Sequence, residues 1–110
     1  MVFCRVQRKI LQKNLRSEDI IERFGGEEFM IIFSNTSPQI AQNVLERCRI
    51  AIEQHRITYA EHEIQITASF GLSALYIYHA DQHELIQRTD AALYKAKQSG
   101  RNNVQQDIES

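Results

Sequence analysis

The sequence predicts an α+β fold in which an antiparallel-rich sheet is packed against helices. A Gly-Gly pair at 25–26 separates two β-prone runs, which is typical of a tight hairpin, because primed turns need positive φ angles that glycine reaches at little cost. The stretch 63–75 alternates strictly between apolar and polar residues, as a half-buried strand does. Three further segments carry apolar residues at helical spacing. The expected order is helix, hairpin, helix, strand, helix and a short last strand.

The first part of the chain predicts one helix and the hairpin. Apolar residues recur every three or four positions across 3–15, which indicates an amphipathic helix. A short polar connection at 16–19 leads into strands expected at 20–24 and 28–33. The second of these strands is apolar at nearly every position, as is typical of a central strand covered on both faces.

The second helix has a well-defined start. Ser37 is a favourable cap and Pro38 suits the first helical position, so we expect a helix from Pro38 to about residue 55. Its apolar face is predicted to consist of Ile40, Ala41, Val44, Leu45, Cys48 and Ile52.

Glycine also marks the last part of the chain. Gly71 weakens the interior of the 63–75 strand unless a ligand or a neighbouring helix must come close there, and both alternatives remain open. Asp81 and Glu84 have the spacing of a capping box that opens the last helix, and Gly100 is its expected C-terminal cap. The predicted buried face of this helix consists of Leu85, Ile86, Thr89, Leu93 and Ala96.

The C-terminal end is predicted to be less regular. We expect a short edge strand at 101–104 and a frayed tail from 105. The chain is therefore divided into one domain at 1–105 and a tail at 106–110.

Composition narrows the classes of function. The chain has 110 residues, enough for one core, and 43% hydrophobic with 25% charged residues is ordinary for a globular protein. A net charge of −1 lacks the basic surplus of a general nucleic-acid binder. Cys4 and Cys48 form no CxxC motif, so neither a disulfide framework nor a zinc site is indicated, and a reduced cytoplasm fits. The longest apolar run, 29–33, is too short to span a bilayer, so this segment predicts no membrane contact.

The hairpin tip and the end of the last helix carry the candidate chemistry. Glu27 and Glu28 follow the two glycines, and Mg²⁺ prefers carboxylate oxygen together with substrate phosphate, which suggests a metal-dependent nucleotide site. The alternative is a solvated turn. Lys97 and Arg101 are four residues apart, so on a helix they can project the same way and clamp phosphates. The alternative is that they complement the helix C-terminus.

Three spaced motifs together resemble the GGDEF domain of diguanylate cyclases. They are Arg-Phe-Gly-Gly-Glu-Glu-Phe at 23–29, Thr-Ala-Ser-Phe-Gly at 67–71, and Asp-Ala-Ala-Leu-Tyr-Lys-Ala-Lys with Gly-Arg-Asn in 90–102. The resemblance covers nearly the whole chain in the right order. It implies a ferredoxin-like palm related to nucleotide cyclases and polymerases, which condenses two GTP into cyclic di-GMP and pyrophosphate. It also implies a homodimer in which two domains face each other, each presenting one GTP.

The resemblance assigns roles to the hairpin residues. Gly25 and Gly26 are implied to lie against the nucleotide. Glu27 is implied to ligate Mg²⁺ (or Mn²⁺) and to help deprotonate the attacking 3′-hydroxyl, and Glu28 to support the site. Phosphoryl transfer consists largely of positioning and charge neutralisation, which suits a carboxylate, a metal ion and nearby cations.

The resemblance also assigns roles to basic residues. Lys97 and Arg101 match the phosphate-binding Lys and Arg of the family. Arg16 and Asp19 match its RxxD inhibitory site, with Arg47 as the secondary arginine, and the product cyclic di-GMP is implied to bind there. Arginine suits this task because its planar fork can meet guanine O6 and N7 and also pair with phosphate. The alternative is a plain surface ion pair.

The chain departs from the family pattern at its start. The family's first strand and helix, with a metal-binding Asp and groups that read guanine, have no counterpart, so the domain is a C-terminal portion. The missing strand lies in the middle of the sheet, and its loss is expected to open a slot lined by apolar side chains and unpaired backbone groups. We therefore expect this chain not to be a competent cyclase alone, and a sensory domain, attached or separate, to belong to the full protein.

Two other functions remain open from the sequence. One is a non-catalytic cyclic di-GMP receptor that uses the RxxD site, and the other is an inactive relic. An RNA-binding module is disfavoured, because the polar face of the 63–75 strand carries Gln, Thr, Ser and Gly where stacking aromatic residues would be needed.

Overall fold

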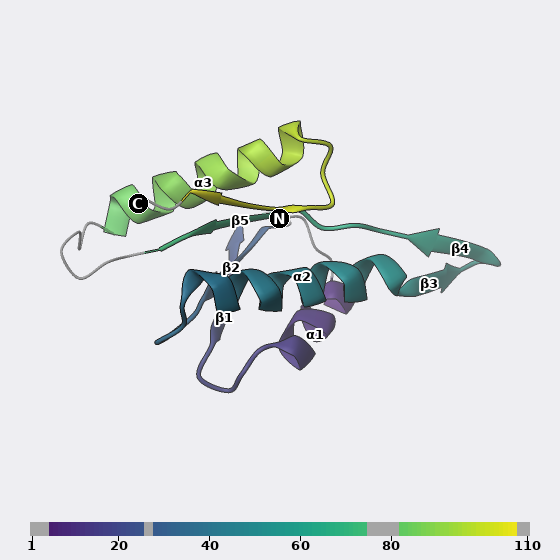
Figure 1. Ribbon diagram of the computed structural model, residues 1–110. Coiled ribbons are helices and arrows are strands. Elements are labelled where there is room, and N and C mark those ends of the chain that lie inside the picture. Colours follow the sequence, from purple (N-terminus) through teal and green to yellow (C-terminus); the bar gives the residue numbers. More distant parts are fainter. Residues whose placement is uncertain (1–4, 26–27, 75–81, 108–110) are drawn as a thin grey trace.

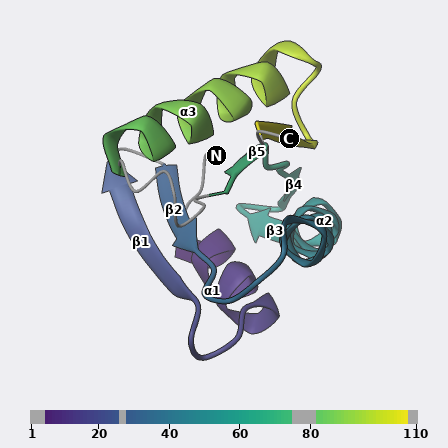
Figure 2. The ribbon, with the colours of Figure 1, turned by 60° about the vertical axis from the view of Figure 1, so that its left-hand side comes forward.

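The computed structural model describes residues 5–25, 28–74 and 82–107. The elements in chain order are α1 (Arg5–Asn14), β1 (Ile20–Gly25), β2 (Glu28–Ile32), α2 (Pro38–Gln54), β3 (Arg56–Tyr59), β4 (His62–Gln65), β5 (Phe70–Ser73), α3 (Gln82–Gln98) and β6 (Val104–Asp107). Helix α3 covers one face of the β5–β6 pair and α2 lies on the other, with α1 packed against α2 (Figures 1 and 2). The predicted α+β class is confirmed.

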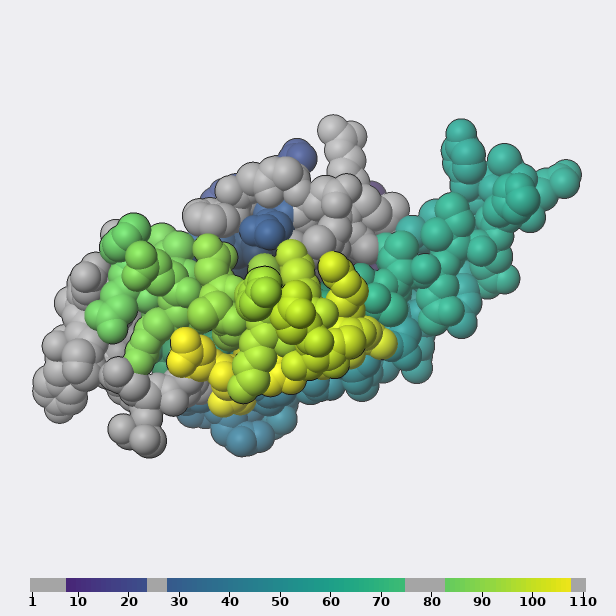
Figure 3. All heavy atoms as spheres, turned by 90° about the horizontal axis from the view of Figure 1, so that it is seen from above, coloured from purple at the N-terminus to yellow at the C-terminus, as the bar shows by residue number. Residues whose placement is uncertain are grey.

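The described strands form three separate pairs. β1–β2 and β3–β4 are antiparallel hairpins, whereas β5 and β6 run parallel. The alternation predicted one long strand at 63–75, but the structure has two strands there, β4 and β5. The first part of the stretch pairs with β3 and its last part pairs with β6, so the two halves have different partners. The β3–β4 hairpin projects beyond the helices as a narrow extension (Figures 1 and 3).

The predicted β1–β2 hairpin is confirmed. Its register runs from Ile20 opposite Ile32 to Gly25 opposite Glu28, with an irregularity between Arg23 and Gly25. The expectation that β2 is a central strand covered on both faces is wrong for the described chain. Among the described strands, β2 pairs only with β1 and is therefore an edge strand. Its last residue, Ile32, is 48% exposed, so its faces are not fully covered either.

The core is built mainly where α2 meets α1 and β5. Its buried members are Leu11, Phe29, Ala41, Leu45, Cys48, Ile52, Ala68, Phe70 and Leu72. Helix α2 begins as predicted, since the Oγ of Ser37 accepts a hydrogen bond from the Ile40 N–H at 3.3 Å. Ile40 itself is exposed because it lies to the side of the buried row at 41, 45, 48 and 52. Burial raises the pKa of the Cys48 thiol to about 11, although the charge of Arg47 opposes the shift.

Gly71 resolves one open alternative, because α3 crosses directly over it. A Cβ atom at Gly71 would lie 2.3 Å from the backbone nitrogen of Leu93 and 2.6 Å from the carbonyl oxygen of Thr89. Next to this crossing, the Ser73 Oγ lies 2.5 Å from the Thr89 Oγ1. Gly71 is therefore needed for the close approach of a neighbouring helix, one of the two alternatives that the sequence left open.

The end of α3 is the predicted glycine cap. Gly100 has a φ of 102°, and the Arg101 N–H donates to the Ala96 carbonyl at 3.0 Å, the long closing bond of a Schellman turn. The proposed capping residue Asp81 lies outside the described residues. Ala92, which the predicted buried face omitted, is buried in the middle of the helix.

The chain after this turn is more ordered than expected. β6 pairs with β5 from Val104 opposite Phe70 to Asp107 opposite Ser73, so residues 105–107 are a strand and not a frayed tail. Residues 101–103, expected to begin the strand, form the turn that leads into it. Among the described helices, none is both long and apolar enough to cross a membrane.

Candidate nucleotide and product sites

The acidic hairpin tip and the basic end of α3 lie together. The Nζ of Lys97 is 3.7 Å from the Oε1 of Glu28, and both side chains are partly exposed. Glu28 begins β2 and is held there by its register with Gly25, while Lys97 lies in the last turn of α3. Seen from above, blue atoms of the hairpin emerge beside α3 (Figure 3). This contact joins two segments that the sequence predicted to share one site.

Two of the predicted tip residues, Gly26 and Glu27, lie outside the described residues. Gly25 is the last residue of β1 and is paired with Glu28, the first residue of β2. The roles predicted for Gly26 and Glu27 stay predictions.

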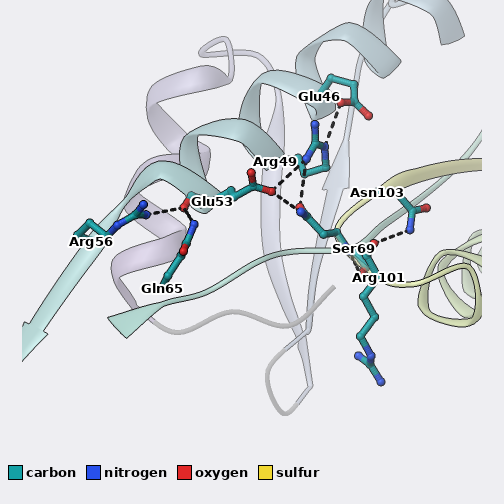
Figure 4. Close-up of polar contacts among 9 residues, drawn as sticks. Glu46, Arg49, Glu53, Arg56, Gln65, Ser69, Arg101 and Asn103 are labelled. Carbon is teal, nitrogen blue, oxygen red and sulfur yellow. Dashed lines mark hydrogen bonds and ion pairs between the residues drawn. The ribbon is translucent and has the colours of Figure 1, made fainter. Parts of the chain in front are cut away.

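Arg101 occupies a different setting from the one predicted. Helix α3 ends at Gln98, and Arg101 has a φ of 62°, so it lies in the turn beyond the helix. The four-residue helical spacing therefore does not make it project beside Lys97. Its side chain is exposed and extends away from Arg49 and Glu53 of α2 (Figure 4).

A cavity lies between the β1–β2 pair and the β5–β6 pair. β2 lines it with residues that include Phe29 and Ile31, β5 with Phe70 to Leu72, and α3 with residues that include Leu93. β2 and β5 are not paired with each other. The cavity is lined mainly by apolar side chains, as the expected slot would be, while the absence of a strand from the full protein stays a prediction.

The described residues alone do not form a metal centre. No group of three or more His, Cys, Asp and Glu side chains within them is arranged to hold an ion. Glu28 and Asp90 both reach the cavity and offer carboxylate oxygens, the donor type that a hard divalent cation takes. The donor chemistry of the tip thus fits, and the predicted ligand Glu27 lies beside it in sequence.

The predicted inhibitory residues Arg16 and Asp19 form a compact ion pair. The Arg16 backbone N–H donates to the Asp19 carboxylate at 2.9 Å, and the guanidinium lies 3.6 Å from its other oxygen. The Asp19 side chain is 1% exposed, and its Oδ1 has no hydrogen-bond partner among the described residues. The guanidinium also pairs with Glu18 at 3.3 Å.

Arg16 also joins the connection before β1 to the loop before α2. Its Nη2 donates to the Ser34 carbonyl at 3.3 Å and to the hydroxyl of Thr36. Half of the Arg16 side chain stays exposed. Arg47 lies on the exposed side of α2. The structure thus gives Arg16 a structural task and leaves part of its surface accessible.

Sequence reasoning missed a polar cluster that joins α2 to the turn after α3. Arg49 pairs with Glu46 at 3.0 Å and with Glu53 at 3.4 Å, and it donates to the Asn102 side-chain oxygen at 3.1 Å (Figure 4). The three- and four-residue spacing on α2 indicates ion pairs along the helix. It gives no sign of Asn102, which arrives from another element.

The chain resembles known proteins over most of its length. The family model described as the GGDEF domain of diguanylate cyclases matches residues 2–103. Diguanylate cyclase A of Treponema denticola is 38% identical over 87% of this chain, and the diguanylate cyclase DgcP of Pseudomonas aeruginosa is 38% identical over 86%. The matches cover 26% and 14% of those two proteins, so the chain corresponds to a small part of each.

Solved structures show the same fold. The GGDEF domain of DgcB from Caulobacter crescentus, in complex with c-di-GMP, superimposes with a TM-score of 0.87 at 27% identity, covering 93% of this chain and 61% of that one. The diguanylate cyclase SiaD of Pseudomonas aeruginosa, in complex with its activator SiaC, gives 0.86 at 32% identity, covering 92% and 38%. From the motifs, the fold and these matches, the chain belongs to the GGDEF domain family of diguanylate cyclases.

Proposed function

We propose that this chain provides the GTP-binding portion of a diguanylate cyclase site, and that two such domains condense two GTP molecules into cyclic di-GMP and pyrophosphate. The single observation that carries the proposal is the contact between Lys97 and Glu28 at 3.7 Å. It brings a cation from the end of α3 to the acidic tip of the hairpin, as a site for a metal-bound triphosphate requires.

Each side of the proposed site has a chemical task. Glu27 and Glu28 supply carboxylate oxygens, and Gly25 and Gly26 let the nucleotide approach the backbone closely. A divalent ion, Mg²⁺ or Mn²⁺, held by Glu27 would neutralise phosphate charge and lower the pKa of the attacking hydroxyl. In the proposed role, Glu27 helps to accept the proton of that 3′-hydroxyl.

Lys97 and Arg101 meet the phosphates. In the ligand-free chain the Lys97 ammonium is balanced by Glu28. Triphosphate oxygens carry more negative charge than one carboxylate, so binding exchanges this partner for a stronger one. The exposed guanidinium of Arg101 can present two parallel N–H groups to phosphate oxygens.

The RxxD residues form the proposed product site. The Arg16 side chain is half exposed, and both its backbone N–H and its guanidinium contact the Asp19 carboxylate. Arg47 adds a second guanidinium from α2. A guanine edge accepts paired hydrogen bonds through O6 and N7, which suits such arginines. Cyclic di-GMP bound there would limit further synthesis. In this proposal a sensory domain, attached or separate, controls the cyclase in a cytoplasmic setting.

The assignment is tested on this chain by calorimetry with GTP and Mg²⁺. We expect Glu27→Gln to weaken binding in the presence of metal by about tenfold or more, which is about 1.4 kcal/mol. Glu22→Gln is the matched control, because Glu22 is an exposed carboxylate in β1, away from the turn. Equal affinities for the parent chain and Glu27→Gln would remove Glu27 from the site.

Turnover is tested separately by chromatography of cyclic di-GMP formed from GTP. We expect this chain alone to form little product, and a longer form of the protein that fills the cavity between β2 and β5 to form it in a manner dependent on Glu27. Product formation that survives Glu27→Ala in the longer form would contradict the proposed role.

A further inference from the structure

The turn after α3 has an unusual backbone. Gly100, Arg101 and Asn102 follow one another with φ angles of 102°, 62° and 49°. Glycine accepts such angles at little cost and asparagine adopts them more readily than most residues, whereas an arginine loses about 1 kcal/mol or more. Two successive residues with positive φ also occur at Ala60 and Glu61, in the exposed turn between β3 and β4. The turn after α3 differs from that one because hydrogen bonds to α3, to the residue before β5 and to α2 hold it.

The main chain of the turn is held from two sides. The Arg101 N–H donates to the Ala96 carbonyl at 3.0 Å, and the Asn102 N–H donates to the Ser69 Oγ at 3.1 Å. Ser69 is a buried polar residue directly before β5. On the far side, Asn103 donates its side-chain N–H to Ala96 at 2.9 Å and its carbonyl accepts from the Phe70 N–H at 2.9 Å.

Helix α2 holds the side chain of Asn102. The amide oxygen accepts from Arg49 at 3.1 Å and the amide nitrogen donates to the Glu53 carboxylate (Figure 4). Arg49 is itself fixed between Glu46 and Glu53, and its side chain is mostly buried. We call Arg49, Glu53 and Asn102 the Asn102 clamp.

We propose that the Asn102 clamp is a positioning device for Arg101 in phosphate binding, an inference that rests on the proposed function. Arg101 is the residue adjacent to Asn102, and its guanidinium extends away from the clamp into solvent (Figure 4). Neither Arg49 nor Glu53 meets the ligand. They fix the backbone from which Arg101 projects, so that less conformational freedom is lost when phosphate binds.

The proposal predicts that a change on α2 acts on GTP through Arg101. In calorimetry of this chain with GTP and Mg²⁺, we expect Arg49→Gln to weaken binding by about fivefold or more. Arg56→Gln is the matched control and is expected to change affinity by less than about twofold. The Arg56 guanidinium donates a hydrogen bond to the backbone carbonyl of Glu53 at 2.9 Å, but Arg56 is not part of the Asn102 clamp.

A double-mutant cycle separates positioning from general stability. On an Arg101→Ala background, Arg49→Gln should cause no further loss of GTP affinity, because the residue through which it acts is gone. On a Lys97→Ala background, the same substitution should keep its full effect. An equal loss on both backgrounds would mean that Arg49 supports the fold in general and would overturn the proposal.

Amide hydrogen exchange tests the clamp without a ligand. In Arg49→Gln, we expect the Arg101 and Asn102 amides to exchange about tenfold faster or more, while the Ser99 amide, bonded to Lys95 at 2.9 Å, keeps its rate. If Arg49→Gln does not fold, Asn102→Gly removes the clamp side chain and still accepts a positive φ. Unchanged exchange at 101 and 102, or equal acceleration at Ser99, would overturn the proposal.

The two measurements distinguish the two proposals. A parent chain with no GTP binding contradicts the proposed function, whereas the exchange pattern still decides whether the clamp holds Arg101. Selective loosening of the turn combined with GTP affinity that does not respond to Arg49→Gln would reject the positioning role alone.

Discussion

The β1–β2 hairpin and the body formed by α2, β5 and α3 are built in opposite ways. In the hairpin, the paired residues Ile20 and Ile32 are each nearly half exposed. In the body, Cys48 and Phe70 are completely buried, and α3 touches the backbone of Gly71. The hairpin is thus anchored in the core at Phe29 but half exposed at its opposite end, whereas the basic turn follows a helix that is packed closely on β5. Substitutions in the body should therefore change stability first, and substitutions at the tip should change ligand binding.

The largest expected effect is that of Gly71→Ala. The added Cβ would meet backbone atoms of Leu93 and Thr89, which cannot turn aside as a side chain can. We expect a loss of about 3 kcal/mol or more in the free energy of unfolding, measured by urea denaturation. Gly100→Ala is the matched control. No atom of the described residues lies within 4 Å of its Cβ position, so the positive φ is what opposes the substitution, at about 1 kcal/mol. Equal losses would show that α3 can move away from β5.

The next largest effect concerns the buried thiol of the body. Because the pKa of Cys48 is raised from 9.0 to about 11, the folded chain holds this proton more tightly than the unfolded chain does. This contribution is complete below the unfolded value and is lost as pH rises between the two values, by about 2 to 3 kcal/mol in all. Cys48→Ala should flatten this part of the stability profile, measured by urea unfolding at about pH 8 and about pH 10.5. The same decline in both proteins would contradict the assignment.

The smallest expected change in stability is at the tip. Glu28→Gln removes the partner of Lys97, but the pair is partly exposed, so the free energy of unfolding should change by less than about 0.5 kcal/mol. Without divalent metal, GTP should bind about threefold tighter, because Lys97 is released and a negative charge is removed. Calorimetry measures the affinity and thermal melting the stability.

Glu63→Gln is the control for the tip. It breaks another exposed pair, with Arg56 at 3.3 Å, on the projecting hairpin. We expect this variant to leave GTP affinity unchanged. A stability loss at Glu28 above about 1 kcal/mol would place the tip within the packed body and remove the contrast between the two regions.

Features that depend on neighbouring residues could be predicted from the sequence. The Gly-Gly pair between apolar runs predicted the hairpin, and the periodic apolar residues with Ser37 and Gly100 predicted the helices and two of their ends. Local chemistry decides each of these features. The candidate residues of the tip were proposed on the same grounds, and the resemblance to a family added their roles.

Features that depend on distant partners could not be predicted. The alternation at 63–75 continues across the point where β4 and β5 take different partners, so nothing in the pattern marks the break. The four-residue spacing placed Arg101 beside Lys97, although the predicted Gly100 cap already ended the helix before it. The sequence could not show that Ser69 and α2 hold the turn through Asn102. Periodicity carries no information on such contacts.

The parallel pairing of β5 with β6 sets an order of events for the folding chain. A hairpin such as β1–β2 closes a short loop, but β6 can join β5 only after α3 has crossed between them. During synthesis, Phe70 of β5 can therefore pair with β6 only after Val104 has been made. The turn that presents Arg101 is completed among the last features of the domain, so a nascent chain cannot hold nucleotide in the proposed manner until its final strand has been made.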